Sequence, residues 1–298
     1  TGTVARLFNL DDEPLLLMHP FDLRQRQLMA GDLARVSNQR GHIVVRVKPG
    51  EALVRGCAWM PMHWGSQFMS SAGVNALTIA ATDPYSLQPE LKHAAVSVEK
   101  AVLPWQLVVM RKAGEGGLAA LPLLEKARSL LSDFAYASVG LYGRAEPLVV
   151  FRAAMSEAMS EDRLREIDVL FGLADDESAI VYADHRRQIS KRAVAPEGRL
   201  MGVRLAGETL AQSWLKDVMA DDALDAALIR WAVAPIGEAP SRLPSKSRVV
   251  CNCADITELQ LRAEISQGTT LPALQEKFKC GTFCGSCLPE LRQMLDEQ

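Results

Sequence analysis

The chain has 298 residues, enough for two or three domains, and 48% of them are hydrophobic, which excludes a disordered protein. A formal net charge of −3 gives no basis for nucleic-acid binding. No apolar run approaches the roughly 18 residues of a membrane-spanning helix, and no signal-peptide pattern opens the sequence. We therefore expect no membrane association and a cytoplasmic location. The chain begins at Thr1, as either a processed protein or a fragment of a longer chain would.

The first hundred residues predict a small β-barrel. Short β-type runs are separated by turn signals, such as the Asn-Gln-Arg-Gly sequence at 38–41 and Pro49-Gly50. Short strands at this density are typical of a barrel. The runs lie at 33–36, 43–47, 52–59, 77–80 and 94–98.

A string of short motifs runs in order through the same region. They are His19-Pro20, Gly-Asp-Leu-Ala-Arg-Val at 31–36, Arg40-Gly41, Met-Pro-Met-His-Trp-Gly at 60–65, Asn-Ala-Leu-Thr at 75–78 and the segment 83–92. Together they resemble the molybdopterin-dinucleotide-binding domain of the large molybdenum oxidoreductases, with the nitrate reductases as the nearest branch. The resemblance implies a double-psi β-barrel over residues 1–100. That barrel would close over one side of a bis-molybdopterin guanine dinucleotide cofactor.

The same resemblance assigns cofactor contacts to Asn75 and Lys92, which match the family positions and their spacing. An amide suits hydrogen bonds to pterin or guanine edges, and a cation suits pyrophosphate or pterin oxygens. Without the resemblance, Asn75 is simply a turn residue and Lys92 a solvated lysine. His63 and Trp64 lie near the stretch that faces the substrate in relatives. The plainer interpretation makes Trp64 a packing residue and His63 a satisfied core histidine, so we assign no catalytic residue.

Some features of the family are missing from the chain. Relatives carry a phosphate-binding stretch with a Trp-His pair, a four-cysteine [4Fe-4S] motif and a molybdenum-ligating cysteine, none of which occurs here. The resemblance therefore implies the C-terminal part of a nitrate reductase, which is not catalytic alone. Its partner would be the N-terminal catalytic portion, which would hold the [4Fe-4S] centre and share the molybdenum cofactor. Cys57 is predicted to lie in the barrel core.

Residues 101–234 predict an α/β module. Strand-like and helix-like runs alternate, and the Gly-rich loop at 114–117 follows no phosphate-binding pattern. The motifs at 182–184, 198–203 and 205–209 resemble the module that precedes a small iron–sulfur domain in NADH-dependent nitrite reductases, which implies a docking scaffold. The predicted strands are 102–110, 180–184, 189–194 and 200–206, and the predicted helices are 119–134, 207–219 and 221–233.

Residues 235–248 predict a linker, because proline alternates there with serine and basic residues.

After the linker, Cys251 and Cys253 form a C-x-C pair, and Cys284 and Cys287 form a C-x-x-C pair. Four thiolates in two close pairs bind tetrahedral zinc or an iron–sulfur cluster. Structural disulfides are the weaker interpretation in a chain of this size. Zinc sites usually use C-x2-4-C at both ends, so the C-x-C spacing favours iron.

The C-x-C pair, the helical stretch after it and the Cys-Gly-Ser-Cys-Leu-Pro-Glu-Leu run at 284–291 resemble the bacterioferritin-associated-ferredoxin type of [2Fe-2S] domain. This resemblance implies a small all-α domain at 249–298 that holds a [2Fe-2S] cluster through Cys251, Cys253, Cys284 and Cys287. Cys280 lies outside both pairs and is predicted not to be a ligand. About fifty residues bury little apolar area, so the metal site would also contribute folding energy.

Together these resemblances predict the cofactor-capping and electron-receiving part of a molybdenum-dependent assimilatory nitrate reductase, which reduces nitrate to nitrite. Electrons would arrive at the [2Fe-2S] centre from a flavoprotein reductase or a ferredoxin. Two alternatives stay open. The chain could be a zinc-binding interaction module, or part of a molybdopterin oxidoreductase that acts on another substrate such as formate.

Overall fold

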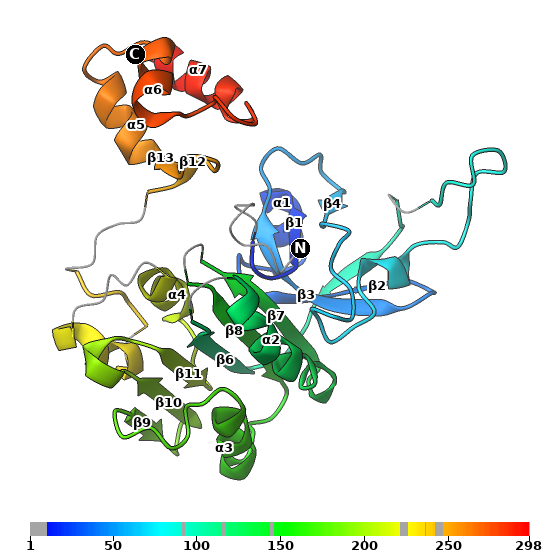
Figure 1. Ribbon diagram of the computed structural model, residues 1–298. Coiled ribbons are helices and arrows are strands. Elements are labelled where there is room, and N and C mark those ends of the chain that lie inside the picture. The colour runs from blue at the N-terminus through cyan, green and yellow to red at the C-terminus, as the bar shows by residue number, and fades with distance from the viewer. Residues whose placement is uncertain are drawn as a thin grey trace. The chain divides into compact units, whose positions relative to one another are not determined.

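The computed structural model describes residues 11–90, 93–114, 117–143, 146–220, 226–235, 237–241 and 247–297. They fall into two compact units, Asp11–Ser241 and Arg242–Gln298 (Figure 1). The boundary between the units lies within the segment 235–248 that was predicted to be a linker. No described helix has the length and apolar character needed to cross a membrane.

The N-terminal part of the first unit is a five-stranded sheet in the order β4-β1-β3-β2-β5. Strand β1 pairs with β3 in parallel, and the other neighbours are antiparallel. Ile43, Val45 and Val47 alternate along β3 and are buried, which is the period of a half-buried strand. The strands are β1 (Leu15–Met18), β2 (Leu33–Ser37), β3 (His42–Pro49), β4 (Ala58–Trp59) and β5 (Ser97–Lys100), and the helices are α1 (Pro20–Gln25) and the 3-10 helix η1 (Val74–Leu77).

The sheet-rich character predicted for this region is confirmed, but the double-psi barrel stays a prediction. Two of the expected strands differ from the structure. The run 52–59 is mostly turn and forms a strand only at β4, because Gly56 adopts a left-handed φ of 81° just before it. The run 77–80 begins in the 3-10 helix η1, and the described structure has no strand there.

The second part of the first unit is a six-stranded antiparallel sheet in the order β7-β8-β6-β11-β10-β9. Strand β8 is buried from Leu148 to Ala154, because helices cover both faces of the sheet. The strands are β6 (Trp105–Lys112), β7 (Tyr136–Tyr142), β8 (Leu148–Met155), β9 (Ile180–Asp184), β10 (Ile189–Val194) and β11 (Gly202–Ala206). The helices are α2 (Leu121–Arg128), α3 (Glu161–Leu170) and α4 (Gln212–Ala220), with the 3-10 helices η2 (Gly117–Ala120), η3 (Leu131–Asp133), η4 (Pro196–Gly198) and η5 (Ala226–Val233).

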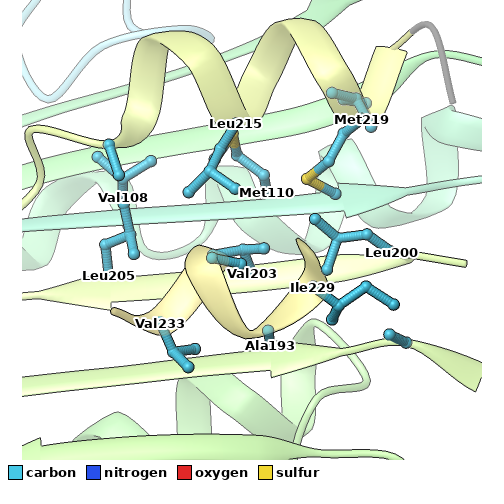
Figure 2. Close-up of a cluster of buried hydrophobic side chains, with 14 of the residues drawn as sticks. Val108, Met110, Ala193, Leu200, Val203, Leu205, Leu215, Met219, Ile229 and Val233 are labelled. Atoms are coloured by element: carbon cyan, nitrogen blue, oxygen red, sulfur yellow. The ribbon is translucent and has the colours of Figure 1, made fainter. Parts of the chain in front are cut away.

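One face of this sheet packs against α4 and η5. Figure 2 shows Val108, Val203 and Leu205 from neighbouring strands beneath Leu215 of α4, with Val233 of η5 in the same cluster. The opposite face carries aromatic contacts. Phe151 of β8 lies 5.6 Å from Phe134 and 6.2 Å from Phe171, ring centre to ring centre.

The N-terminal part of the first unit contacts the six-stranded sheet through backbone hydrogen bonds between the segment 68–70 and β7. The amide of Ser70 donates to the carbonyl of Ala137 at 2.9 Å, and the amide of Val139 donates to the carbonyl of Phe68 at 2.9 Å. Gly140 of β7 permits a close approach, because a Cβ there would lie 2.5 Å from the carbonyl oxygen of Asp12. The sheets therefore share one packed structure.

The second unit begins with a two-stranded ribbon and continues with three described helices. The ribbon is a small addition to the predicted all-α domain, and the helical character is confirmed. Thr257 and Gln260 form a capping box at the start of α5, which satisfies the first amides of that helix. The elements are β12 (Val249–Cys251), β13 (Ile256–Thr257), α5 (Glu258–Ile265), α6 (Leu271–Phe278) and α7 (Leu288–Asp296).

Replacement of Leu205 by Ala should destabilise the first unit by about 2 to 5 kcal/mol, because this fully buried side chain would leave a cavity between β11 and α4. Val181→Ala is the matched control, since Val181 is 52% exposed on β9 and its loss should cost less than about 0.5 kcal/mol. Urea unfolding followed by tryptophan fluorescence measures both, and every tryptophan of the chain precedes residue 242. Equal midpoints for the two variants would contradict the assigned core.

Candidate functional site

The four paired cysteines of the second unit come together in the structure. Cys251 ends β12, Cys253 follows it in a turn, and Cys284 and Cys287 lie between α6 and α7. The Sγ of Cys253 donates a hydrogen bond to the Sγ of Cys284 at 3.3 Å, and Cys251 lies close enough to Cys287 to raise the pKa of the Cys287 thiol. Each pair thus joins one thiol of the C-x-C motif to one of the C-x-x-C motif, across about 30 residues of sequence.

The two thiol pairs differ in exposure. Cys251 and Cys287 are buried in the core of the unit, whereas Cys253 and Cys284 are exposed. Among the described residues, no three His, Cys, Asp or Glu side chains already meet at a single metal-binding point. Four thiols in two adjacent pairs nevertheless match the four-thiolate ligand set of a [2Fe-2S] cluster, and also that of a structural zinc site. A group held here would have one side in the core and one side at the surface.

Local hydrogen bonds lower the pKa of the Cys284 thiol. The hydroxyl of Ser286 lies 3.1 Å from the Cys284 sulfur, and together with the Ser286 amide and Cys253 it lowers the pKa of Cys284 to about 7. Burial is the main reason that the pKa of Cys287 is raised to about 12. The cysteine spacing alone does not point to Ser286, although a serine two residues after a paired cysteine indicates in the sequence that a hydroxyl can reach the sulfur.

Cys280 lies in the core of the unit rather than in either pair. Its side chain is fully buried, and its Sγ donates to the carbonyl of Leu274 at 3.5 Å. Burial raises the pKa of this thiol, which disfavours the thiolate that a metal requires. Gly281 follows with a left-handed φ of 71°, which strains any residue with a side chain, and a Cβ there would lie 2.6 Å from the Leu288 side chain, which would have to shift. The prediction that Cys280 is not a ligand is consistent with these contacts.

Of the two residues predicted to contact a molybdenum cofactor, the structure describes Asn75 alone. Asn75 is exposed in η1, and Lys92 lies outside the described residues. The loop that carries Asn75 is fixed, because Asn38 and Arg40 both donate to the carbonyl of Leu77, at 2.7 and 2.9 Å. Asn75 is therefore presented to solvent from a well-anchored turn.

Three further predictions for the N-terminal part can be compared with the structure. Trp64 is buried and packs edge-to-face on Phe68, which confirms the packing interpretation. His63 is exposed, so it is not a core histidine. The prediction that Cys57 lies in the core is wrong. Cys57 is exposed because it ends a turn, in which its amide donates to Val54, ahead of the short and exposed strand β4.

Comparisons with known proteins agree with these features. Residues 1–95 match the family described as molydopterin dinucleotide binding domain, and residues 249–297 match the family described as BFD-like [2Fe-2S] binding domain. Over 99% of its length, the chain is 30% identical to a nitrate reductase of Klebsiella oxytoca. The chain is a relative of nitrate reductases. It spans 32% of the length of that relative. The BFD-like match covers all four paired cysteines, and the resemblance to part of a nitrate reductase is confirmed.

In the metal-free chain, Cys284 should be the thiol of the second unit that iodoacetamide alkylates fastest at pH 7. It is exposed, and a pKa of about 7 leaves about half of it as the reactive thiolate, so its rate should rise as the pH increases through 7. Ser286→Ala removes a hydrogen bond to the thiolate and should slow the reaction. Ser266→Ala, at the end of α5, is the control and should not. Mass spectrometry of the modified peptides measures the rates. Faster alkylation of Cys287 would contradict the assignment.

Proposed function

We propose that the chain is the cofactor-capping and electron-receiving part of a molybdenum-dependent assimilatory nitrate reductase. The observation that carries this proposal is the four-thiol site in a BFD-like domain, on the same chain as a molydopterin dinucleotide binding domain. The overall reaction would consume nitrate, two electrons and two protons, and release nitrite and water. The chain would act together with the N-terminal catalytic portion of the enzyme, which would carry a [4Fe-4S] centre.

When bound, a [2Fe-2S] cluster supplies one-electron transfer and a molybdenum cofactor supplies oxygen-atom transfer. Cys251, Cys253, Cys284 and Cys287 would hold the cluster. The buried pair anchors it to the core of the unit, while Cys253 and Cys284 leave one side open to an electron donor. Phe283 is 72% exposed beside Cys284 and offers an apolar contact to such a donor. A flavoprotein reductase or a ferredoxin fits that role.

In the N-terminal part, Asn75 and Lys92 would contact the pterin guanine dinucleotide. The anchored loop supports this role, because an amide held on a fixed turn loses little conformational freedom when it forms a hydrogen bond.

All six cysteines are free thiols, as expected in a reducing cytoplasm.

A zinc-binding interaction module is the second candidate, because four paired thiols also suit zinc. Metal analysis with a visible spectrum of anaerobically purified protein separates the two. We expect two irons per chain and the red-brown colour of thiolate-to-iron charge transfer. A colourless protein with one zinc per chain would establish the interaction module instead.

The ligand assignment predicts opposite results for two neighbouring cysteines. Cys284→Ser should abolish or strongly alter the visible spectrum and lower the iron content, because it removes a ligand. Cys280→Ser should leave both intact, because its thiol is bonded to Leu274 in the core. Retention of the cluster in Cys284→Ser, with its loss in Cys280→Ser, would show that the ligand set is misassigned.

The proposed cofactor contact can be tested in the intact enzyme. Lys92→Ala should lower molybdenum content after purification, because loss of a charge-assisted hydrogen bond costs roughly 1.5 to 3 kcal/mol. Lys48→Ala is the matched control, since Lys48 pairs with Asp11 at the protein surface. Molybdenum measured by mass spectrometry gives the comparison. Equal occupancy in both variants would remove Lys92 from the site.

A further inference from the structure

The second unit holds a hydroxyl group against one of its paired sulfurs. The Oγ of Ser286 lies 3.1 Å from the Sγ of Cys284. Both residues are exposed, so the contact is on the side of the site that faces solvent rather than the core. The proposed function assigns Cys284 as a ligand but gives the hydroxyl of Ser286 no role.

The contact is set by the local backbone. Ser286 follows Cys284 by two residues, and Gly285 between them has a left-handed φ of 72° that turns the chain. The turn continues directly into α7, because the amide of Leu288 donates to the carbonyl of Gly285 at 3.0 Å and the buried Cys287 precedes the first residue of the helix. The contact therefore forms within this one loop and needs no metal to hold it.

Ligation of Cys284 decides which atom of the contact donates. In the free thiol, either atom can be the donor. A ligand cysteine is a thiolate without a proton, so the Ser286 hydroxyl donates and the sulfur accepts. A hydrogen bond to an ionised acceptor is stronger than one between neutral groups. One-electron reduction adds negative charge to an iron–sulfur cluster and its ligand sulfurs, so this hydrogen bond stabilises the reduced state more than the oxidised state.

A second hydroxyl in the same loop provides a comparison. Thr282 is exposed, like Ser286, and precedes Cys284 by two residues instead of following it. Its Oγ1 donates to the carbonyl of Lys279 at 2.8 Å, so this hydroxyl is directed at the backbone rather than at a sulfur. The two hydroxyls are therefore equally distant from Cys284 in sequence but differ in their hydrogen-bond partner.

We propose that Ser286 acts through the Cys284 thiolate to raise the reduction potential of the [2Fe-2S] centre. The inference rests on the proposed function, because it requires the cluster. The step that it affects is the transfer of one electron from the donor, which is oxidised, to the cluster, which is reduced, and no covalent bond forms or breaks. A higher potential makes this transfer more favourable.

Redox titration of the anaerobically purified full chain, followed by visible absorption, tests the inference. At a fixed potential, Ser286→Ala should lower the ratio of reduced to oxidised cluster by about three- to tenfold, where tenfold corresponds to about 59 mV for one electron. Ser286→Thr retains the hydroxyl and should titrate close to the wild type. Thr282→Val is the matched control and should leave the potential unchanged, because it removes the hydroxyl that is bonded to the backbone.

Iron content and the visible spectrum of each variant are measured before the titration. Equal potentials in Ser286→Ala and the wild type, with the cluster intact, would overturn the inference and leave the proposed function standing. Equal shifts in Ser286→Ala and Thr282→Val would overturn it too, because they would indicate a change in the loop rather than the loss of one hydrogen bond. Loss of the cluster in Ser286→Ala alone would give the hydroxyl a role in assembly instead. A wild-type chain that carries zinc and no iron would contradict the proposed function, and the inference with it.

Discussion

The buried ion pair between Asp12 and Arg152 holds the two sheets of the first unit together. Asp12 precedes β1 and Arg152 lies in the middle of β8, so the contact joins residues 140 positions apart in the sequence. Burial of two charges is favourable only when their hydrogen bonds are nearly complete. The Asp12 carboxylate meets this condition through Arg152 and Lys216, and Glu13 extends the network to Arg46 and to the hydroxyl of Tyr136. Because the network spans both sheets, the N-terminal sheet has a fixed orientation on the middle module.

The second unit depends on a different constraint. Its helices are short, and its core includes Cys251, Cys280 and Cys287 beside a few aliphatic side chains. Two of those three core cysteines also belong to the thiol pairs. Binding of a metal by these thiols would therefore be coupled to packing of the core, whereas the first unit has a large hydrophobic core of its own.

Local sequence patterns predicted part of this structure. The strands β9, β10 and β11 follow short apolar runs between turn signals, and the structure has them at the expected places. The pattern gave no indication of β7 and β8. Both strands are buried on both faces, so they lack the alternation that identifies a strand with one exposed face. The described part of the predicted helix 221–233 is the 3-10 helix η5. The spacing of apolar residues alone does not distinguish an α-helix from a 3-10 helix.

The candidate site was also predicted only in part from the sequence. Cysteine spacing was sufficient to find four thiols that the fold brings into pairs, because the two cysteines of each motif lie close together in the sequence. It did not indicate which thiols face solvent, nor the role of Ser286. The network around Arg152 was not predictable at all. Its partners are far apart in sequence, and only the topology brings Asp12, Gln212 and Lys216 to the same place.

The short distance between Cys253 and Cys284 affects how the site could be rebuilt after loss of a metal. The two exposed sulfurs lie 3.3 Å apart, and Cys284 forms a thiolate readily. If the metal were lost in the presence of an oxidant, these two thiols would be the first to join as a disulfide, with release of two electrons and two protons. Such a bond would block half of the ligands until a cellular thiol reduced it. Repair of an emptied site would then require reduction before reassembly, so supply of iron and sulfide alone would not restore it.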